Sequence, residues 1–298
     1  MTQTQPHFTD AHEPFERPLA LRGAPRRPGY DHLFIYELEH AWALYFHHGK
    51  ANEVGSEVLK DLERLTQELE GPEAPLSLIS LSARLSKRGR DIFIAGANVT
   101  ERTGWSDDDV RAHVRRQRDI LSRLRRAPVF HLCLINGLAL GWGAEYLITA
   151  DYKIALSSAA FALPETGLGI LPGAGGTSEL ALLIGPAHTL RLGMTGEQID
   201  AQEALRIGLV QEHADDLNAA IERALGLARL VARKSPTALS AFKRGLLDAL
   251  GQDADTRREI EARAYELCVE RGEAAIGRRD FNLIRQGESP AWGPKQLT

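Results

Sequence analysis

Two glutamates stand in stretches of the chain that are otherwise glycine-rich and apolar. Glu145 follows the run 136–144 (NGLALGWGA), and Glu165 is the only charged residue between positions 156 and 176. Burial in such surroundings raises the pKa of a carboxyl group toward the range that is useful for proton transfer. Two such groups suit acid–base chemistry in which one handles water and the other a carbon-bound proton. A structural role stays open for Glu145, because a glutamate near a helix start also complements the helix dipole.

The glycines around these glutamates predict a site for a developing negative charge. The run 136–144 lies between a predicted strand and a predicted helix, where free backbone N–H groups point into the crevice beyond the strand end. A thioester oxygen that becomes an enolate needs such donors, and losing one costs about 3–4 kcal/mol. The stretches 94–98 (IAGAN) and 163–177 (LPETGLGILPGAGGT) have the same character. Turns and close packing are the alternative for each stretch taken alone.

Other catalytic chemistries find little support in the sequence. Two carboxylates can hold a metal, but His131 is the only histidine near them and no aspartate cluster supplies oxygen ligands, so no metal is expected. His131 lies on a predicted buried strand and is expected to be a core histidine. The chain lacks the G-x-S-x-G elbow, the G-x-x-x-x-G-K-[ST] loop, and a G-x-G-x-x-G motif with an acid about 20 residues later.

The net charge of the chain argues against one class of binding partner. The 298 residues include 36 Lys and Arg against 40 Asp and Glu, a formal charge of −4, so a nucleic-acid partner held by a general basic field is not expected. Seven arginines between 111 and 126 form one local basic stretch. We interpret it as a solvated helix face, with contact to a phosphate or a partner as the alternative.

Several features predict a cytoplasmic protein. The first 29 residues lack the apolar core of a signal peptide and contain acids, which transit peptides avoid. The most apolar long stretch, 132–150, is interrupted by Asn136, glycines and Glu145, so no membrane span is expected. Cys133 and Cys268 lie far apart in the sequence, which suits a reducing compartment.

Hydrophobic periodicity divides the chain into three regions. Residues 1–29 carry five prolines and are interpreted as an N-terminal extension. Residues 30–219 mix expected strands (33–37, 41–46, 76–82, 92–95, 129–135, 152–156) with expected helices (56–69, 106 to about 128, 144–150, and from 177). Residues 220–298 are almost wholly helical in pattern (219–233, 236–250, 256–271). This change of element type indicates an α/β core followed by a helical region that docks on a neighbouring subunit.

Three segments together resemble a known family. The runs AGAN, NGLALGWGAEYLITADYKIA and LPETGLGILPGAGGT are similar, in order and spacing, to the signature segments of the crotonase superfamily, especially its enoyl-CoA hydratases. The correspondence extends from about Ala41 to Arg271. The resemblance implies an α/β fold, a spiral of ββα units with a C-terminal helical trimerisation region. It also implies a homotrimer, or a homohexamer of two trimers.

The resemblance also implies roles for individual residues. The backbone N–H groups of Ala97 and Trp142 would form an oxyanion hole for the thioester of an acyl-CoA substrate. Glu145 would activate water, Glu165 would protonate Cα, and the Gly173 N–H would position the water. Coenzyme A would be part of the substrate, and no separate cofactor is expected. Its binding segments would be Lys50, Ala51, Ala95, Asn98, Val99 and Thr100, with the basic turn near Arg90 facing the phosphates.

Three positions depart from the family pattern. Trp142 stands where glycine is usual, Asn98 where aspartate is usual, and Thr100 where many relatives have lysine. We expect the indole to reshape the acyl pocket, and a positive φ at Trp142 would strain the backbone. The leading prediction is hydration of a trans-2-enoyl-CoA to a 3-hydroxyacyl-CoA, or the reverse dehydration. The alternatives are a Δ3,Δ2-enoyl-CoA isomerase and a non-catalytic crotonase-like protein that binds acyl-CoA or RNA.

Overall fold

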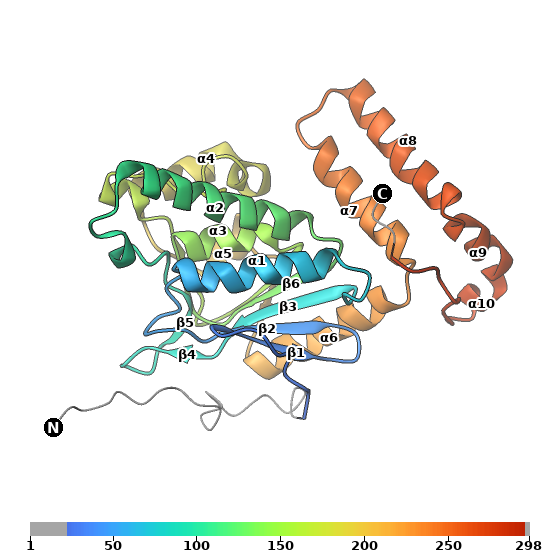
Figure 1. The fold of residues 1–298 in the computed structure, drawn as a ribbon, viewed down its shortest axis with the longest axis horizontal. Helices are drawn as coiled ribbons and strands as arrows, with labels where there is room; N and C mark the ends of the chain where they lie inside the picture. Colours follow the sequence, from blue (N-terminus) through green and yellow to red (C-terminus); the bar gives the residue numbers. More distant parts are fainter. Residues whose placement is uncertain (1–22, 296–298) are drawn as a thin grey trace.

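Two β-sheets form the centre of the molecule in a computed structural model that describes residues 23–295 (Figure 1). The larger sheet has the strand order β1-β2-β3-β6-β8-β11 and the smaller one β10-β9-β7-β5-β4. The larger sheet contains β1 (Leu33–Glu37), β2 (Trp42–Phe46), β3 (Ser77–Ser82), β6 (Phe130–Ile135), β8 (Tyr152–Leu156) and β11 (Glu212–Ala214). The smaller sheet contains β4 (Arg84–Leu85), β5 (Asp91–Ile94), β7 (Leu138–Leu140), β9 (Ala160–Ala162) and β10 (Ile199–Asp200).

The chain alternates between the two sheets and then enters a helix. β6 is followed by β7 and α3 (Trp142–Tyr146), and β8 by β9 and α4 (Leu180–Thr195). β2, β3, β6 and β8 pair in parallel, and so do β5, β7 and β9, while β1 and β2 form an antiparallel hairpin. This confirms the predicted α/β spiral of ββα units. The expected loop 136–143 contains β7, a strand of three residues that is too short for periodicity to reveal.

The larger sheet is buried on both faces. Alternate residues of β2 serve different cores, since Leu44 and Phe46 pack with the helices on one face while Ala43 and Tyr45 pack with the helix on the other. The first face is covered by α1 (Ser56–Glu70) and α2 (Asp107–Arg126), and the second by α6 (Leu217–Ala232) (Figure 1). A capping box precedes α2, in which Ser106 and Asp109 exchange hydrogen bonds between side chain and backbone.

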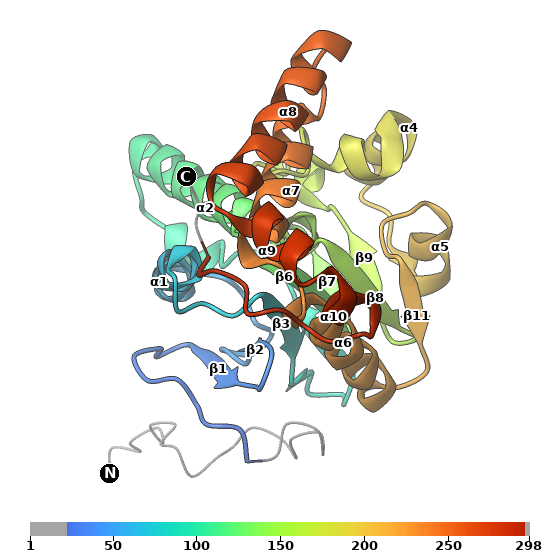
Figure 2. The same cartoon turned by 90° about the vertical axis from the view of Figure 1, so that its right-hand side faces the viewer.

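The C-terminal helices stand to one side of the two sheets. They are α7 (Pro236–Ala249), α8 (Ala254–Glu270), α9 (Glu273–Arg279) and α10 (Phe281–Arg285), and α8 has no buried residue (Figures 1 and 2). Lys243 attaches α7 to the core, because its ammonium group donates to Asp151 Oδ2 at 2.7 Å and to the Val129 carbonyl at 2.9 Å. The predicted boundary at residue 220 falls inside α6, which packs on the sheet through Ala220 and Ile221.

Residues 1–22, which make up most of the predicted extension 1–29, lie outside the described residues. Among the residues that follow them, Arg27 pairs with Glu37 and with Glu68 at 2.9 Å, and its guanidinium stacks on the ring of Trp42. The N-terminal end of the described chain is therefore attached to β1, β2 and α1. No helix in residues 23–295 is long and apolar enough to span a membrane.

Candidate active site

Three neighbouring parallel strands of the smaller sheet lead into the three glycine-bearing segments. β5 ends at Ile94 before 95–98, β7 ends at Leu140 before Gly141 and Glu145, and β9 ends at Ala162 before Glu165. The carboxyl ends of adjacent parallel strands share one edge of a sheet, and ligands of α/β proteins commonly bind there. The fold thus brings together segments that are up to 70 positions apart in the sequence.

Glu145 lies in α3 with its carboxylate buried against the segment after Glu165. Its side chain is 3% exposed, and Oε1 accepts hydrogen bonds from the backbone N–H groups of Ala174 at 2.7 Å and Gly176 at 2.9 Å. Burial raises the pKa of Glu145 from 4.5 to about 7, and the charge of Glu165 acts in the same direction. The two backbone donors oppose the shift. The carboxyl group can therefore gain or lose a proton near neutral pH.

Glu165 opens a 3₁₀ turn (Glu165–Leu168) directly after Pro164. Its side chain is buried, and burial raises its pKa above the ordinary value of 4.5. Oε2 of this carboxyl group has no hydrogen-bond partner among the described residues. A buried oxygen without a partner is costly unless water or a ligand satisfies it, so this atom is available to a bound molecule.

Gly141 lies against the Glu165 carboxyl group and directly before α3, the helix that carries Glu145. Its backbone has φ 51° and ψ −119°, and a Cβ placed on it would lie 2.5 Å from Glu165 Oε1. Its carbonyl accepts from the Glu145 N–H at 2.9 Å, which begins α3, and its own N–H donates to the Ala162 carbonyl at 2.8 Å. Only glycine adopts this backbone conformation without strain and leaves room for the carboxylate.

The two predicted oxyanion donors stand at the ends of β5 and β7. Trp142 is the first residue of α3, so its N–H has no partner within the helix. The Ala97 N–H makes no hydrogen bond within residues 23–295. Its neighbours pair with Val54 instead: the Gly96 carbonyl accepts from the Val54 N–H, and the Asn98 N–H donates to the Val54 carbonyl. The structure places both residues at the site edge and leaves both donors free for a ligand.

Trp142 does not have the positive φ that would have strained its backbone. The positive φ belongs to Gly141, and among the described residues Asn52 is the only non-glycine residue with positive φ. The indole is 2% exposed and belongs to the core, with its ring centroid 5.8 Å from that of Tyr146. The first residue of a helix tolerates any side chain for which there is room, and here the indole packs into the core. Its effect on the acyl pocket stays a prediction.

Gly173 directly precedes Ala174, which donates to Glu145, and it has a neighbour that the sequence did not single out. The Arg118 Nε donates to the Gly173 carbonyl at 2.9 Å, and a Cβ on Gly173 would lie 3.1 Å from Val114. Arg118, Ala174 and Gly176 were missed as site residues. Ala174 and Gly176 act through backbone groups, which carry no signal of their own in a sequence.

The predicted coenzyme A segments lie side by side. The Ala95 N–H donates to the Ala51 carbonyl at 3.0 Å, while Lys50 is exposed and its carbonyl accepts from Arg84 at 3.2 Å. Asn52 organises this loop with φ 55°, and its buried amide donates to Ser82 Oγ and to the carbonyls of Phe46 and Phe93. Sequence reasoning missed Asn52 and Arg84, although asparagine after Gly49 was a turn signal.

The segment after Ala97 forms a short turn at the surface. Asn98 Oδ1 accepts from the Thr100 hydroxyl at 2.7 Å, and Val99 is 48% exposed. Thr100 begins a 3₁₀ turn (Thr100–Arg102), and Glu101 Oε2 accepts the Ser56 N–H at the start of α1. Asn98 and Thr100 therefore stabilise the turn through each other.

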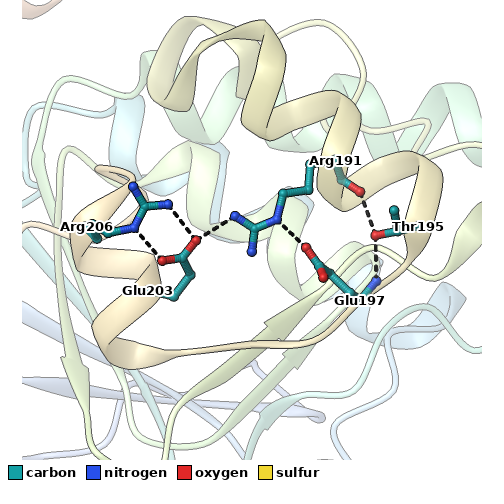
Figure 3. A network of polar contacts seen from close by, with 5 residues as sticks. All are labelled: Arg191, Thr195, Glu197, Glu203 and Arg206. Atoms are coloured by element: carbon teal, nitrogen blue, oxygen red, sulfur yellow. Dashed lines mark hydrogen bonds and ion pairs between the residues drawn. The ribbon is translucent and has the colours of Figure 1, made fainter.

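A network of polar contacts joins α4, the turn after it and α5 (Ala201–Arg206), as Figure 3 shows. Arg191 on α4 pairs with Glu197 and, at 2.6 Å, with Glu203 on α5, which Arg206 also contacts at 2.6 Å. Hydrogen bonds from Arg206 and then Arg191 lower the pKa of Glu203 to about 2. The turn that this network closes packs its Gly196 against Pro164, directly before Glu165.

Other candidate groups of the sequence have structural partners. His131 is fully buried and bonded to Ser80 Oγ and the Thr149 carbonyl, which confirms a core histidine. Six of the seven arginines of α2 have a hydrogen-bond or ion-pair partner, and among the described residues only Arg115 has none. Within residues 23–295 no group of three or more His, Cys, Asp or Glu is placed to hold a metal ion.

Comparison with known proteins identifies the family. The profile described as enoyl-CoA hydratase/isomerase matches residues 85–286, which is more than half of the chain. A short-chain-enoyl-CoA hydratase of Clostridium acetobutylicum is 32% identical over 220 residues, covering 73% of this chain and 81% of the relative. A crotonyl-CoA hydratase of Syntrophomonas wolfei is 30% identical over 243 residues, covering 80% and 90%.

Solved structures agree with this result. The crystal structure of an enoyl-CoA hydratase from Bacillus anthracis superposes with a TM-score of 0.79 at 29% identity, covering 88% of this chain and 99% of that one. Fold, sequence segments and the arrangement of the site residues therefore point the same way. The chain belongs to the enoyl-CoA hydratase/isomerase family.

Proposed function

We propose that this protein is an enoyl-CoA hydratase, which adds water to a trans-2-enoyl-CoA to give a 3-hydroxyacyl-CoA or catalyses the reverse dehydration. The observation that carries the proposal is the pair of buried carboxyl groups of Glu145 and Glu165, which are close enough for the charge of Glu165 to raise the pKa of Glu145. Hydration needs two proton-transfer groups, because one proton leaves water and another is delivered to carbon. The relatives named as enoyl-CoA hydratases support the same class of reaction.

In this mechanism the thioester oxygen accepts hydrogen bonds from the N–H groups of Ala97 and Trp142. Ionised Glu145 removes a proton from a water molecule that the Gly173 N–H positions, while the water oxygen bonds to Cβ. The electron pair of the double bond shifts toward the thioester oxygen as an enolate, which the two donors stabilise. Protonated Glu165 then delivers its proton to Cα, and the carbonyl re-forms.

The presence of Glu145 favours hydration over isomerisation. A Δ3,Δ2-enoyl-CoA isomerase needs one base to move a proton between two carbons and has no water to activate. Here two backbone donors orient Glu145 and burial holds its pKa near 7. An ordered carboxylate of this pKa is matched to activating water at neutral pH.

The proposal includes the substrate's coenzyme A and the protein's assembly. Lys50, Ala51, Ala95, Asn98, Val99 and Thr100 would contact coenzyme A, and no metal or separate cofactor takes part. The α7–α10 helices expose large apolar side chains such as Phe242 (74%) and Tyr265 (69%), which supports burial in a homotrimer or a homohexamer. Both cysteines are free thiols, consistent with a cytoplasmic location.

The test is the loss of the conjugated enoyl absorbance of crotonyl-CoA. We expect Glu165→Gln and Glu145→Gln to lower kcat by several orders of magnitude while binding of a saturated acyl-CoA stays nearly unchanged, since neither change removes a thioester contact. Glu203→Gln, in the outer network of Figure 3, is the matched control and should retain turnover within a few fold. Unchanged turnover in Glu165→Gln would refute the mechanism.

A second substrate separates the two reactions of the family. In 3-enoyl-CoA no water is added, so an enzyme that works mainly as an isomerase would convert it faster than it hydrates crotonyl-CoA, and Glu145→Gln would retain that activity. The proposed hydratase instead loses its main activity in this variant. A protein that binds acyl-CoA but turns over neither thioester would be a non-catalytic member of the family.

A further inference from the structure

A cavity of about 300 Å³ is lined by Glu145. Its lining also includes Ala174 and Gly175, and, from other elements, Arg118, Leu121 and Ile148. None of Ala97, Trp142 and Glu165 lines it. A substrate that places its thioester oxygen at the oxyanion hole and its Cβ beside Glu145 would therefore direct the next acyl atoms toward this cavity.

One guanidinium group that lines the cavity has no salt bridge among the described residues, although its charge helps to lower the pKa of Glu145. Of the three arginines that line it, Arg125 pairs with Glu179, and Arg126 pairs with Asp248 at 2.7 Å. Arg118 has no carboxylate partner among the described residues, and its one hydrogen bond runs from Nε to the Gly173 carbonyl. Its two terminal nitrogens therefore present free donors in the planar fork that binds a carboxylate through two parallel hydrogen bonds.

One peptide unit sets the distance between Arg118 and Glu145. The Gly173 carbonyl accepts from Arg118 at 2.9 Å, and the N–H of the same peptide, on Ala174, donates to Glu145 Oε1 at 2.7 Å. Across a planar trans peptide this arrangement separates the Arg118 Nε from the Glu145 oxygen by at most about 8 Å. A water molecule, Cβ and a short acyl end fit into that span, and a long chain does not.

We propose that Arg118 binds a carboxylate at the far end of the acyl group, so that the preferred substrates are 2-enoyl-CoA thioesters of short dicarboxylic acids. The carboxylate would stand two or three bonds beyond Cβ, as in the five-carbon glutaconyl-CoA. This inference rests on the proposed function, because it takes Cβ to lie beside Glu145. It makes Arg118 a specificity-determining residue.

An apolar groove beside this cavity would suit the competing class of substrate, thioesters with a long apolar acyl chain. A second cavity of about 490 Å³ shares Arg125, Ile148 and Leu182 with the first and is lined mainly by apolar side chains. A long apolar acyl chain would have to pass the unpaired Arg118 and the Arg125–Glu179 pair to reach it. Placing methylene groups beside an unpaired guanidinium removes water from the charge without replacing its hydrogen bonds, which is unfavourable.

The experiment compares glutaconyl-CoA with 5-methylhex-2-enoyl-CoA, in which an isopropyl group replaces the carboxylate at the same position. We expect the wild-type kcat/KM to favour glutaconyl-CoA by roughly 10–100-fold, the range of a charge-assisted carboxylate contact. Arg118→Gln should abolish this preference and bring the ratio of the two kcat/KM values close to one, while any loss of base orientation lowers both values alike. The preference should also shrink as salt is added in the wild type and not in the variant.

Arg115→Gln is the matched control, since Arg115 is also unpaired and on α2 but does not line the cavity. It should retain the full preference. Equal loss of both substrates in Arg118→Gln, or a wild type that prefers the apolar or a long-chain thioester, would overturn the inference. Calorimetric binding of the saturated analogues, glutaryl-CoA and 5-methylhexanoyl-CoA, makes the test independent of turnover. A protein that prefers glutaryl-CoA through Arg118 but hydrates neither enoyl thioester would refute the proposed function and support this inference.

Discussion

Replacing Glu145 by glutamine should stabilise the folded protein while it abolishes hydration. The carboxylate is 3% exposed, and its pKa is raised from 4.5 to about 7, with burial as the main cause. Each tenfold change in proton affinity is worth about 1.4 kcal/mol, so ionised Glu145 costs the folded state about 3 kcal/mol at high pH. Glutamine carries no charge and keeps an oxygen that accepts from Ala174 and Gly176.

The direction of the pKa shift of Glu145 determines the pH range in which the substitution changes stability. Below pH 4.5 the carboxyl group is protonated in both the folded and the unfolded chain, so the substitution changes little. Between pH 4.5 and 7 the unfolded chain loses the proton and the folded chain keeps it, so this group makes wild-type stability fall as the pH rises. The free energy of unfolding of Glu145→Gln should therefore exceed that of the wild type by an amount that grows across this window and levels off near pH 8.

Urea unfolding at pH 5 and pH 8, at one fixed protein concentration, measures the difference. Glu63→Gln is the matched control, because it removes a half-exposed carboxylate that pairs with Arg116. This variant should show no gain in the free energy of unfolding. Glu165→Gln should show a gain of the same sign, because burial also raises the pKa of Glu165. If Glu145→Gln is no more stable than the wild type at pH 8, burial does not raise this pKa, and the acid–base reasoning about Glu145 fails with it.

Four further substitutions, at three positions, test the scaffold. Gly141→Ala combines a strained positive φ with a Cβ that would lie 2.5 Å from Glu165 Oε1. The rate of hydration should therefore fall at least about 100-fold while the circular dichroism spectrum stays unchanged. Normal turnover would contradict this geometry. Trp142→Gly should lower the free energy of unfolding by about 3–5 kcal/mol in urea. Trp142→Phe should be near neutral, because the indole N–H has no partner among the described residues. Lys243→Met leaves the Asp151 carboxylate without its ammonium partner and should lower the free energy of unfolding by about 1.5–3 kcal/mol, with faster proteolysis before α7. An unchanged urea midpoint would show that the pair does not hold α7.

The long elements and the acidic site residues could be predicted from the sequence because their signals are local. The leucines of α1 recur at helical spacing, and Ser106 and Asp109 form a capping box over four positions. Glu145 and Glu165 stood out because a charge among apolar residues and glycines needs a reason. The strands β7 and β9 were missed, since three residues carry too little periodicity to distinguish a strand from a loop.

What the sequence could not show depends on contacts between distant segments. Ala174 and Gly176 orient Glu145 through N–H groups that every residue but proline carries, so nothing in their side chains marks them. Strain at Trp142 was expected only if that position had a positive φ, and the sequence did not show that Gly141, one position earlier, has the positive φ instead. This difference of one position lets the bulky indole pack in the core without backbone strain, and residue type alone does not determine backbone conformation so finely.

Burial of Glu145 explains both the loss of stability that its charge causes and its suitability as a catalytic base. A carboxylate in water would have an ordinary pKa and would be almost fully ionised at pH 7, but it would also be a weaker base. Here burial raises the pKa, and two N–H donors restrain the rise so that the ionised form remains accessible at neutral pH. Arg118 holds the carbonyl of the peptide whose N–H orients Glu145, so the residue that we propose to select the acyl group also fixes this base. Substrate recognition and base orientation would then be coupled through a single peptide bond, and loss of either hydrogen bond should disturb both.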